Sequence, residues 1–232
     1  MAAFRFLRRW VNVGPAWRPR GRADASGGRI IITGTGRAGT TFLVQLFSFL
    51  GFDTGFCSET AMAAVDRISH AGLEHCLTAE PNPYVIKSPW FAEELLTALA
   101  EGRVAVRAAI VPVRDLVDAA ESRRRVCREA AKEGFDPLSH SGALWLTADP
   151  AAQEAKLAEA FHRAIYALVK YEIPIYFAEF PRLALDAGHL YRSLEPLLDE
   201  HGVTREEFVR AHRAAARPEF IHMTERRPVD AH

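Results

Sequence analysis

A glycine-rich turn near the start of the chain has the composition of an anion-binding loop. It follows a β-branched apolar run at residues 29–33 and leads directly into an amphipathic stretch that begins at Thr40. Its glycines are Gly34, Gly36 and Gly39. Glycine lets the backbone fold closely around a ligand, so several N–H groups can converge on one anion. A helix that begins at Thr40 would add the positive end of its dipole, so we expect a phosphate-binding loop.

This loop departs from the nucleotide-hydrolase pattern G-x-x-x-x-G-K-[ST] at its cation. Gly34, Gly39 and Thr41 fit the pattern, but Thr40 occupies the lysine position. A cation stands at Arg37 instead. The loop therefore favours a phosphate-like ligand and argues against ordinary ATP hydrolysis.

Two further cations follow predicted strands. Lys87 ends the run 84–87, and Arg114 comes directly after the run 104–113. Ligands of open parallel sheets collect outside the carboxyl ends of the strands, so Arg37, Lys87 and Arg114 should crowd one edge. Because like charges repel strongly when they are buried together, such a cluster needs a polyanionic ligand.

The elements that must position these side chains alternate along the chain. The predicted strands are residues 29–33, 84–87, 104–113 and 173–178. The predicted helices are residues 40–50, 61–69, 89–100, 115–132, 151–171, 189–201 and 204–215. This alternation predicts an α/β fold: a single P-loop-type domain whose parallel sheet has about 4–5 strands, flanked by helices on both faces.

Length and charge bound the organisation of the chain. Its 232 residues fit one domain, which we place at residues 29–215, after a basic flexible arm at 1–28 and before a short tail at 216–232. Lys+Arg and Asp+Glu both number 29, so the chain has no net positive charge that would indicate binding to nucleic acid.

The arm and the cysteines bear on membrane contact and on the cellular compartment of the protein. No run approaches the roughly 20 apolar residues that cross a bilayer. Weak contact of the arm with a membrane surface is the alternative to a solvated arm, and its apolar residues are Phe4, Phe6, Leu7 and Trp10. Three cysteines are too few for a disulfide framework or a zinc site, so we expect a cytoplasmic protein with reduced thiols.

In this order and spacing, residues 29–125 resemble the PAPS-dependent sulfotransferases, above all their tyrosylprotein and carbohydrate-type branches. Arg37-Ala-Gly-Thr-Thr41 is similar to the family's 5′-phosphosulfate loop, R-S-G-T-T, with Ala38 in place of the serine. Arg114 and Ser122 match the arginine and serine, eight residues apart, that bind the 3′-phosphate of the donor.

Two shorter motifs extend the resemblance. Lys87-Ser-Pro89 is similar to the K-x-P element that holds a second cation near the transferred sulfuryl group. Glu59-Thr60 falls where the tyrosylprotein enzymes carry an E-T pair whose glutamate is the proposed general base. The glycine-rich lid of the cytosolic small-molecule branch is not recognisable.

The resemblance implies transfer of a sulfuryl group from PAPS (3′-phosphoadenosine-5′-phosphosulfate) to a hydroxyl of a carbohydrate or another polar acceptor, with no metal required. Arg37 and Lys87 would stabilise the developing charge, and Glu59 would take the acceptor's proton. The implied donor-binding residues are Gly36, Arg37, Ala38, Gly39, Thr40, Thr41, Arg114 and Ser122.

Several alternatives stay open at this stage. His70 and His75 are alternative bases, and Asp115 is interpreted as a helix N-cap in preference to a magnesium ligand. Arg123–Arg125 are interpreted as a partly solvated helix face, and the alternative is that one of them reaches the donor or an anionic acceptor. A P-loop kinase or NTPase and a non-catalytic nucleotide-binding module are the other candidate functions, and the sequence names neither the acceptor nor the oligomeric state.

Overall fold

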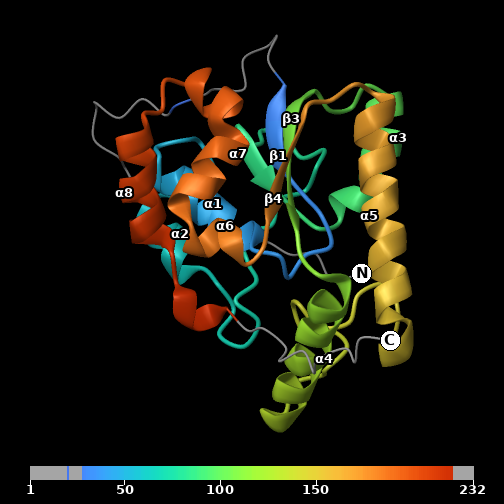
Figure 1. Ribbon diagram of the computed structural model, residues 1–232. Helices are drawn as coiled ribbons and strands as arrows, with labels where there is room; N and C mark the ends of the chain where they lie inside the picture. Colours follow the sequence, from blue (N-terminus) through green and yellow to red (C-terminus); the bar gives the residue numbers. More distant parts are fainter. Residues whose placement is uncertain (1–19, 21–27, 222–232) are drawn as a thin grey trace, which may run out of the picture.

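The computed structural model describes Arg20 and residues 28–221, which form an α/β domain (Figure 1). Its sheet has the strand order β2-β1-β3-β4, and every pairing is parallel. The strands are β1 (Arg29–Ile32), β2 (Val85–Lys87), β3 (Val106–Val113) and β4 (Ile175–Glu179). The predicted parallel sheet is therefore confirmed, with four strands in the described residues.

The register of the sheet places the ends of the strands at one edge. Ile32, the last residue of β1, pairs with Lys87 of β2 on one side and with Ile110 of β3 on the other. Strand β3 continues to Val113, which pairs with Glu179 at the end of β4. The loops that follow β1, β2 and β3 consequently leave the sheet close together.

Helices cover both faces of this sheet, as predicted. One face packs against α1 (Thr40–Phe49), α6 (Arg182–Leu185), α7 (Ala187–Asp199) and α8 (Arg205–Ala215). The other face packs against α3 (Phe91–Ala100) and α5 (Gln153–Lys170). Alternation along β1 serves both cores, because Ile30 and Ile32 join the first cluster and Ile31 joins the second.

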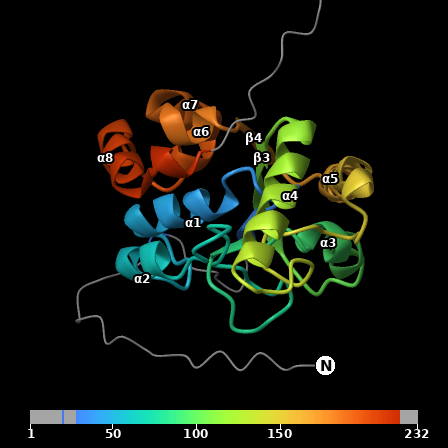
Figure 2. The same ribbon diagram turned by 90° about the horizontal axis from the view of Figure 1, so that it is seen from below.

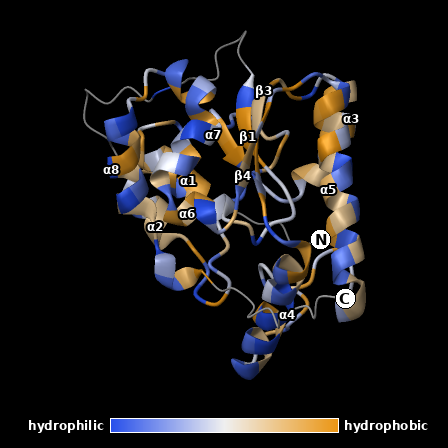
Figure 3. Cartoon of the chain, viewed as in Figure 1, coloured by the Kyte–Doolittle hydropathy of each residue, from blue (hydrophilic) through white to orange (hydrophobic). Residues whose placement is uncertain are grey.

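Two helices lie towards the edge where the strands end. They are α2 (Ser58–Ala63) and α4 (Leu116–Lys132). Figure 1 shows α4 below the sheet, and the view from below places it between α1 and α5 (Figure 2). Its ribbon carries more hydrophilic residues than those of the strands do (Figure 3). Asp115 caps α4 as predicted, accepting from the Asp118 N–H at 3.1 Å.

Helix boundaries differ from the prediction mainly in the region after α1. The helix expected at residues 61–69 is found at Ser58–Ala63. It stops early because the Asp66 carboxylate accepts from the backbone N–H groups of Ile68 and Ser69, which holds these residues in a turn. Helix α6 was not predicted, since four residues are too few to show a helical period.

Arg20 is described from within the N-terminal arm, apart from the residues next to β1. It forms a parallel β-bridge with Phe52 and an ion pair with Glu207 of α8 at 2.8 Å. The residues predicted for membrane contact, and most of the predicted C-terminal tail, lie outside the described residues. Within Arg20 and residues 28–221, no helix has the length and apolar character needed to span a bilayer.

We expect the N-terminus of α8 to make the stability of the fold depend on acid pH. The pKa of Glu207 is lowered from its ordinary value of 4.5 to about 2. The larger cause is the hydrogen bond from the Thr204 backbone N–H, and the next is that from the Arg20 side chain. A carboxyl whose pKa is lowered by folding stabilises the fold while it is ionised. Glu207→Gln should therefore be less stable than the wild type at pH 7. The difference should shrink as the pH falls from about 4.5 through about 2.

Denaturant unfolding over a pH series measures this difference. Glu206→Gln, at the exposed neighbouring position, is the matched control and should change stability much less. A Glu207→Gln deficit that stays constant from pH 7 to the acid end would contradict the assignment.

Candidate functional site: an arginine-rich loop mouth

The loop between β1 and α1 has the backbone of an anion cradle. Gly36, Arg37 and Gly39 have φ angles of 66°, 57° and 86°, so the chain turns sharply through left-handed conformations. Helix α1 begins immediately afterwards at Thr40, with no side-chain cap and no acidic residue in its first turn. The positive end of α1 thus faces the loop without a neutralising carboxylate of its own.

Three of the predicted donor-binding residues meet at this loop. Arg37 Nε donates to Ser122 Oγ at 3.1 Å, and Arg114 Nη1 donates to the Arg37 carbonyl at 3.0 Å. A second Arg37 N–H donates to the Ser69 carbonyl. The Arg114 guanidinium also lies over the Phe180 ring, 4.9 Å from its centroid. The strand-end arginine and the helix serine are therefore joined to the loop through a single residue.

Positive charge dominates the electrostatics at the loop mouth. Burial, followed by repulsion from Arg125 and Arg114, lowers the pKa of Arg37 to about 10, and attraction by Asp66 is a smaller opposing effect. Burial lowers the pKa of Arg114 as well, and Arg125 adds to that effect against the attraction of Asp118. These shifts mean that the charged forms cost free energy here, which a bound anion would offset.

Arg123 braces the loop from the α4 side. It is 4% exposed, and its Nη2 and Nη1 donate to the carbonyls of Thr35 at 2.7 Å and Ala143 at 2.8 Å. Its guanidinium lies 5.2 Å from the Trp145 ring centroid, and its Nε is buried without a hydrogen-bond partner. Burial, with a contribution from Arg37, lowers its pKa to about 9.

The prediction of a partly solvated face for Arg123–Arg125 is therefore wrong for Arg123. Its position shares the buried stripe of α4 with Ala119, Val126 and Ala130. That i, i+4, i+7, i+11 spacing was a readable signal for burial. The prediction was based on the charge of the three consecutive arginines and not on their helical period.

Lys87 reaches the loop helix from β2. It is 2% exposed, and its Nζ donates to Glu74 Oε1 at 2.6 Å, to the Gly72 carbonyl at 2.7 Å and to Thr41 Oγ1 at 3.3 Å. Burial lowers the pKa of Lys87, against the attraction of Glu74. Glu74 was not predicted, because a single glutamate in a loop has no periodicity or motif to mark it.

The structure does not bring the predicted base to this cluster. Glu59 is exposed in the first turn of α2, where its own backbone N–H, Cys57 and Ser58 lower its pKa. In the described part of the chain, no hydrogen bond or ion pair joins Glu59 to the loop residues or to Lys87. Its role as the base stays a prediction.

The two alternative bases are held by other contacts. His75 Nδ1 accepts from the Lys87 backbone N–H at 3.3 Å, and burial lowers its pKa to about 4. The His70 ring stacks on Phe220, with centroids 3.9 Å apart. Among the residues described, no group of three or more His, Cys, Asp and Glu side chains is arranged to hold a metal ion.

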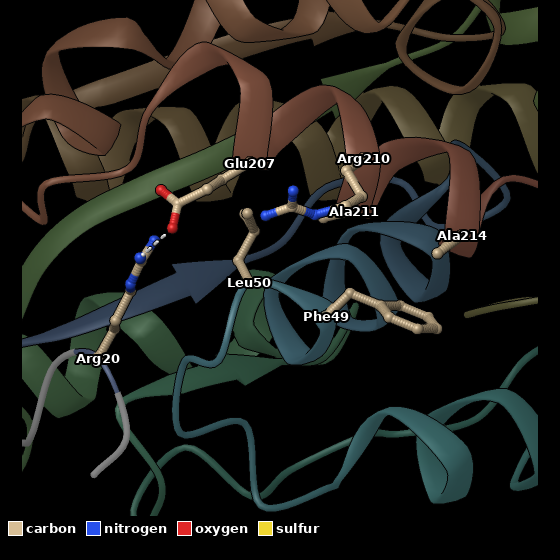
Figure 4. Close-up of a pocket in the computed structure, with 7 residues that line it drawn as sticks. All are labelled: Arg20, Phe49, Leu50, Glu207, Arg210, Ala211 and Ala214. Carbon is tan, nitrogen blue, oxygen red and sulfur yellow. Dashed lines mark hydrogen bonds and ion pairs between the residues drawn. The ribbon is translucent and has the colours of Figure 1, made fainter. Parts of the chain in front are cut away.

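A separate cavity of about 270 Å³ lies between the end of α1 and α8 (Figure 4). It is lined by Arg20, Phe49, Leu50, Glu207, Arg210, Ala211 and Ala214. Figure 4 shows the Arg20–Glu207 ion pair at its edge. At 1.5 Å per residue, Phe49 stands about 14 Å along α1 from the loop, so this cavity is distinct from the arginine cluster.

Comparisons with known proteins add a structural likeness. No protein-family model matches the sequence, and no curated protein matches it. The solved structure of the sulfotransferase domain from the Synechococcus PCC 7002 olefin synthase matches 84% of this chain and 81% of its own. The two chains are 12% identical and superpose with a TM-score of 0.42. At these values the likeness assigns no function to this chain.

The packing of Arg123 against the loop predicts a specific cost at Gly36. An alanine at a left-handed position costs roughly 1–2 kcal/mol from the backbone alone. At Gly36 the added Cβ would also lie 2.6 Å from Arg123 Nη2, whereas at Gly134, with a φ of 81°, it would meet nothing within 4 Å. Gly36→Ala should therefore lower the free energy of unfolding more than the matched Gly134→Ala. Equal losses by denaturant titration would show that Arg123 moves aside freely and does not brace the loop.

Proposed function

We propose that this protein is a sulfotransferase that moves the sulfuryl group of PAPS to a hydroxyl of a carbohydrate or another polar acceptor. One observation carries the proposal: Arg37, Arg114 and Ser122 are joined by hydrogen bonds at the mouth of the glycine loop. The class of acceptor and a cytoplasmic location are parts of the same proposal.

The arrangement suits a ligand with two anionic groups. The loop backbone, the N-terminus of α1 and the hydroxyls of Thr40 and Thr41 form one anion site, to which Lys87 contributes through its contact with Thr41. Arg114 and Ser122 form the second, and Arg37 contacts both of these residues. The donor set consists of guanidinium, ammonium, hydroxyl and backbone N–H groups, which are the partners that phosphate and sulfate oxygens require.

Sulfuryl transfer, like phosphoryl transfer, depends mainly on positioning and on stabilisation of charge. Arg37 and Lys87 would stabilise the charge that builds on the bridging and equatorial oxygens. Here these cations supply the positive charge that magnesium supplies in kinases. The low exposure of Lys87 strengthens the effect, because electrostatic interactions are stronger where water is excluded.

Calorimetry with 3′,5′-adenosine bisphosphate, the desulfated product of PAPS, tests the proposal. The bisphosphate should bind more tightly than 5′-AMP. Arg114→Ala should weaken bisphosphate binding by roughly 10–100-fold, since a hydrogen bond to a charged group contributes about 1.5–3 kcal/mol. The same variant should change 5′-AMP binding little.

Arg128→Ala is the matched control. Arg128, on α4, is exposed and pairs with Glu121 at 2.7 Å, so its removal should leave both affinities unchanged. Wild-type binding of the bisphosphate no tighter than that of 5′-AMP would overturn the proposed function.

A further inference from the structure

A carboxylate lies between the buried lysine of the loop cluster and solvent. Glu74 Oε1 is 2.6 Å from Lys87 Nζ, and its side chain is 34% exposed whereas that of Lys87 is 2% exposed. The same Nζ is 3.3 Å from Thr41 Oγ1 in the first turn of α1. Glu74 is thus one side chain away from the loop helix and accessible from outside.

The backbone around Glu74 is fastened to the end of β2. The His75 N–H donates to the Lys87 carbonyl at 2.8 Å, and the Lys87 N–H donates to His75 Nδ1 at 3.3 Å. The Gly72 carbonyl accepts from Lys87 Nζ, and the Gly72 N–H donates to Glu74 Oε1 at 3.3 Å. Leu73 between them has a φ of 67°. This shape turns the Glu74 carboxylate back onto Lys87.

Three other acids and bases of this region have contacts of their own. Asp66 Oδ1 accepts from the N–H and hydroxyl of Ser69 and lies 3.1 Å from His140 Nε2. His75 uses its Nδ1 as an acceptor, and Glu59 contacts only its own helix end. Glu74 is a carboxylate that an ion pair holds on Lys87, a cation of the cluster.

We propose that Glu74 is the general base of the transfer reaction; this rests on the proposed function. The acceptor oxygen forms a bond to sulfur while the bond from sulfur to the bridging phosphate oxygen breaks. The hydroxyl proton goes to the Glu74 carboxylate. The electron pair of the broken bond stays on the phosphate of the departing adenosine bisphosphate, beside Lys87 and Arg37.

The shared lysine couples the two halves of this step. As negative charge grows on the departing phosphate, the Lys87 ammonium is drawn towards it and away from Glu74. A carboxylate that loses a cationic partner becomes a stronger base. Proton transfer to Glu74 is therefore favoured at the moment when the acceptor hydroxyl becomes acidic.

Release of sulfate from labelled PAPS, with water as the acceptor, tests the proposal over a pH series. Glu74→Gln should lower kcat about 100-fold or more, which is the usual contribution of a general base, and should abolish the acidic limb of the kcat profile. Its affinity for 3′,5′-adenosine bisphosphate should stay within about threefold, since binding does not use the base. Glu74→Asp should recover part of the rate together with the acidic limb.

Two variants control for the neighbouring groups. Lys87 from β2 is the charged group that faces Glu74, Thr41 from α1 is uncharged, and His75 is its neighbour in the chain. Burial lowers the pKa of His75 to about 4, so this residue needs its own control. His75→Gln, which keeps an acceptor for the Lys87 N–H, should retain the acidic limb. Glu59→Gln separates the two candidate bases, because only a base on α2 would make this variant lose the limb.

The outcomes that overturn the proposal differ from those that overturn the proposed function. An unchanged kcat profile in Glu74→Gln would exclude Glu74 as the base. Weaker bisphosphate binding at an unchanged kcat would reduce Glu74 to a residue that holds Lys87. Loss of the acidic limb in Glu59→Gln would move the base to α2. Failure of the wild type to bind the bisphosphate would count against the proposed function and not against the choice of base.

Discussion

Burial of several arginines close together at the loop mouth is the constraint on which the account depends. Arg37, Arg114 and Arg123 all have pKa values lowered chiefly by burial, and neighbouring arginines add to the effect. A fold does not gain stability by gathering like charges in partly dry surroundings. Such a cluster is expected where positive charge has a function, because perturbed pKa values concentrate at functional sites.

The parallel sheet makes this cluster by bringing separate segments to one edge. The end of β1 becomes the glycine loop, the end of β3 supplies Arg114, and the end of β2 supplies Lys87. Helix α4 then adds two side chains. Ser122 accepts a hydrogen bond from Arg37, and Arg123 donates to the Thr35 carbonyl. Each cation is positioned by a different element, so the site exists only in the folded chain.

The sheet and the loop could be predicted from sequence because their signals are local. Short β-branched runs, glycines at the turn and the Asp115 cap each act within a few residues. The proximity of Arg114 and Ser122 followed from one helix leaving one strand. The roles of these residues in binding and catalysis stay predictions.

Other parts of the site depend on contacts between distant segments. Glu74 meets Lys87 because Gly72 and Leu73 adopt left-handed or extended positive-φ conformations, and no periodic pattern marks such a loop. Helix α2 ends earlier than predicted because the Asp66 carboxylate accepts hydrogen bonds from the backbone N–H groups of Ile68 and Ser69. Arg123 differs, because its helical spacing in the sequence already matches the buried stripe of α4. The charge of the side chain favoured the opposite prediction, an exposed position.

A crystal structure with 3′,5′-adenosine bisphosphate tests the central claim most directly. The account predicts the 5′-phosphate against the backbone of residues 36–41 and the 3′-phosphate within hydrogen-bond distance of Arg114 and Ser122. A nucleotide that binds elsewhere on the domain, or that leaves Arg114 without a phosphate contact, would contradict it.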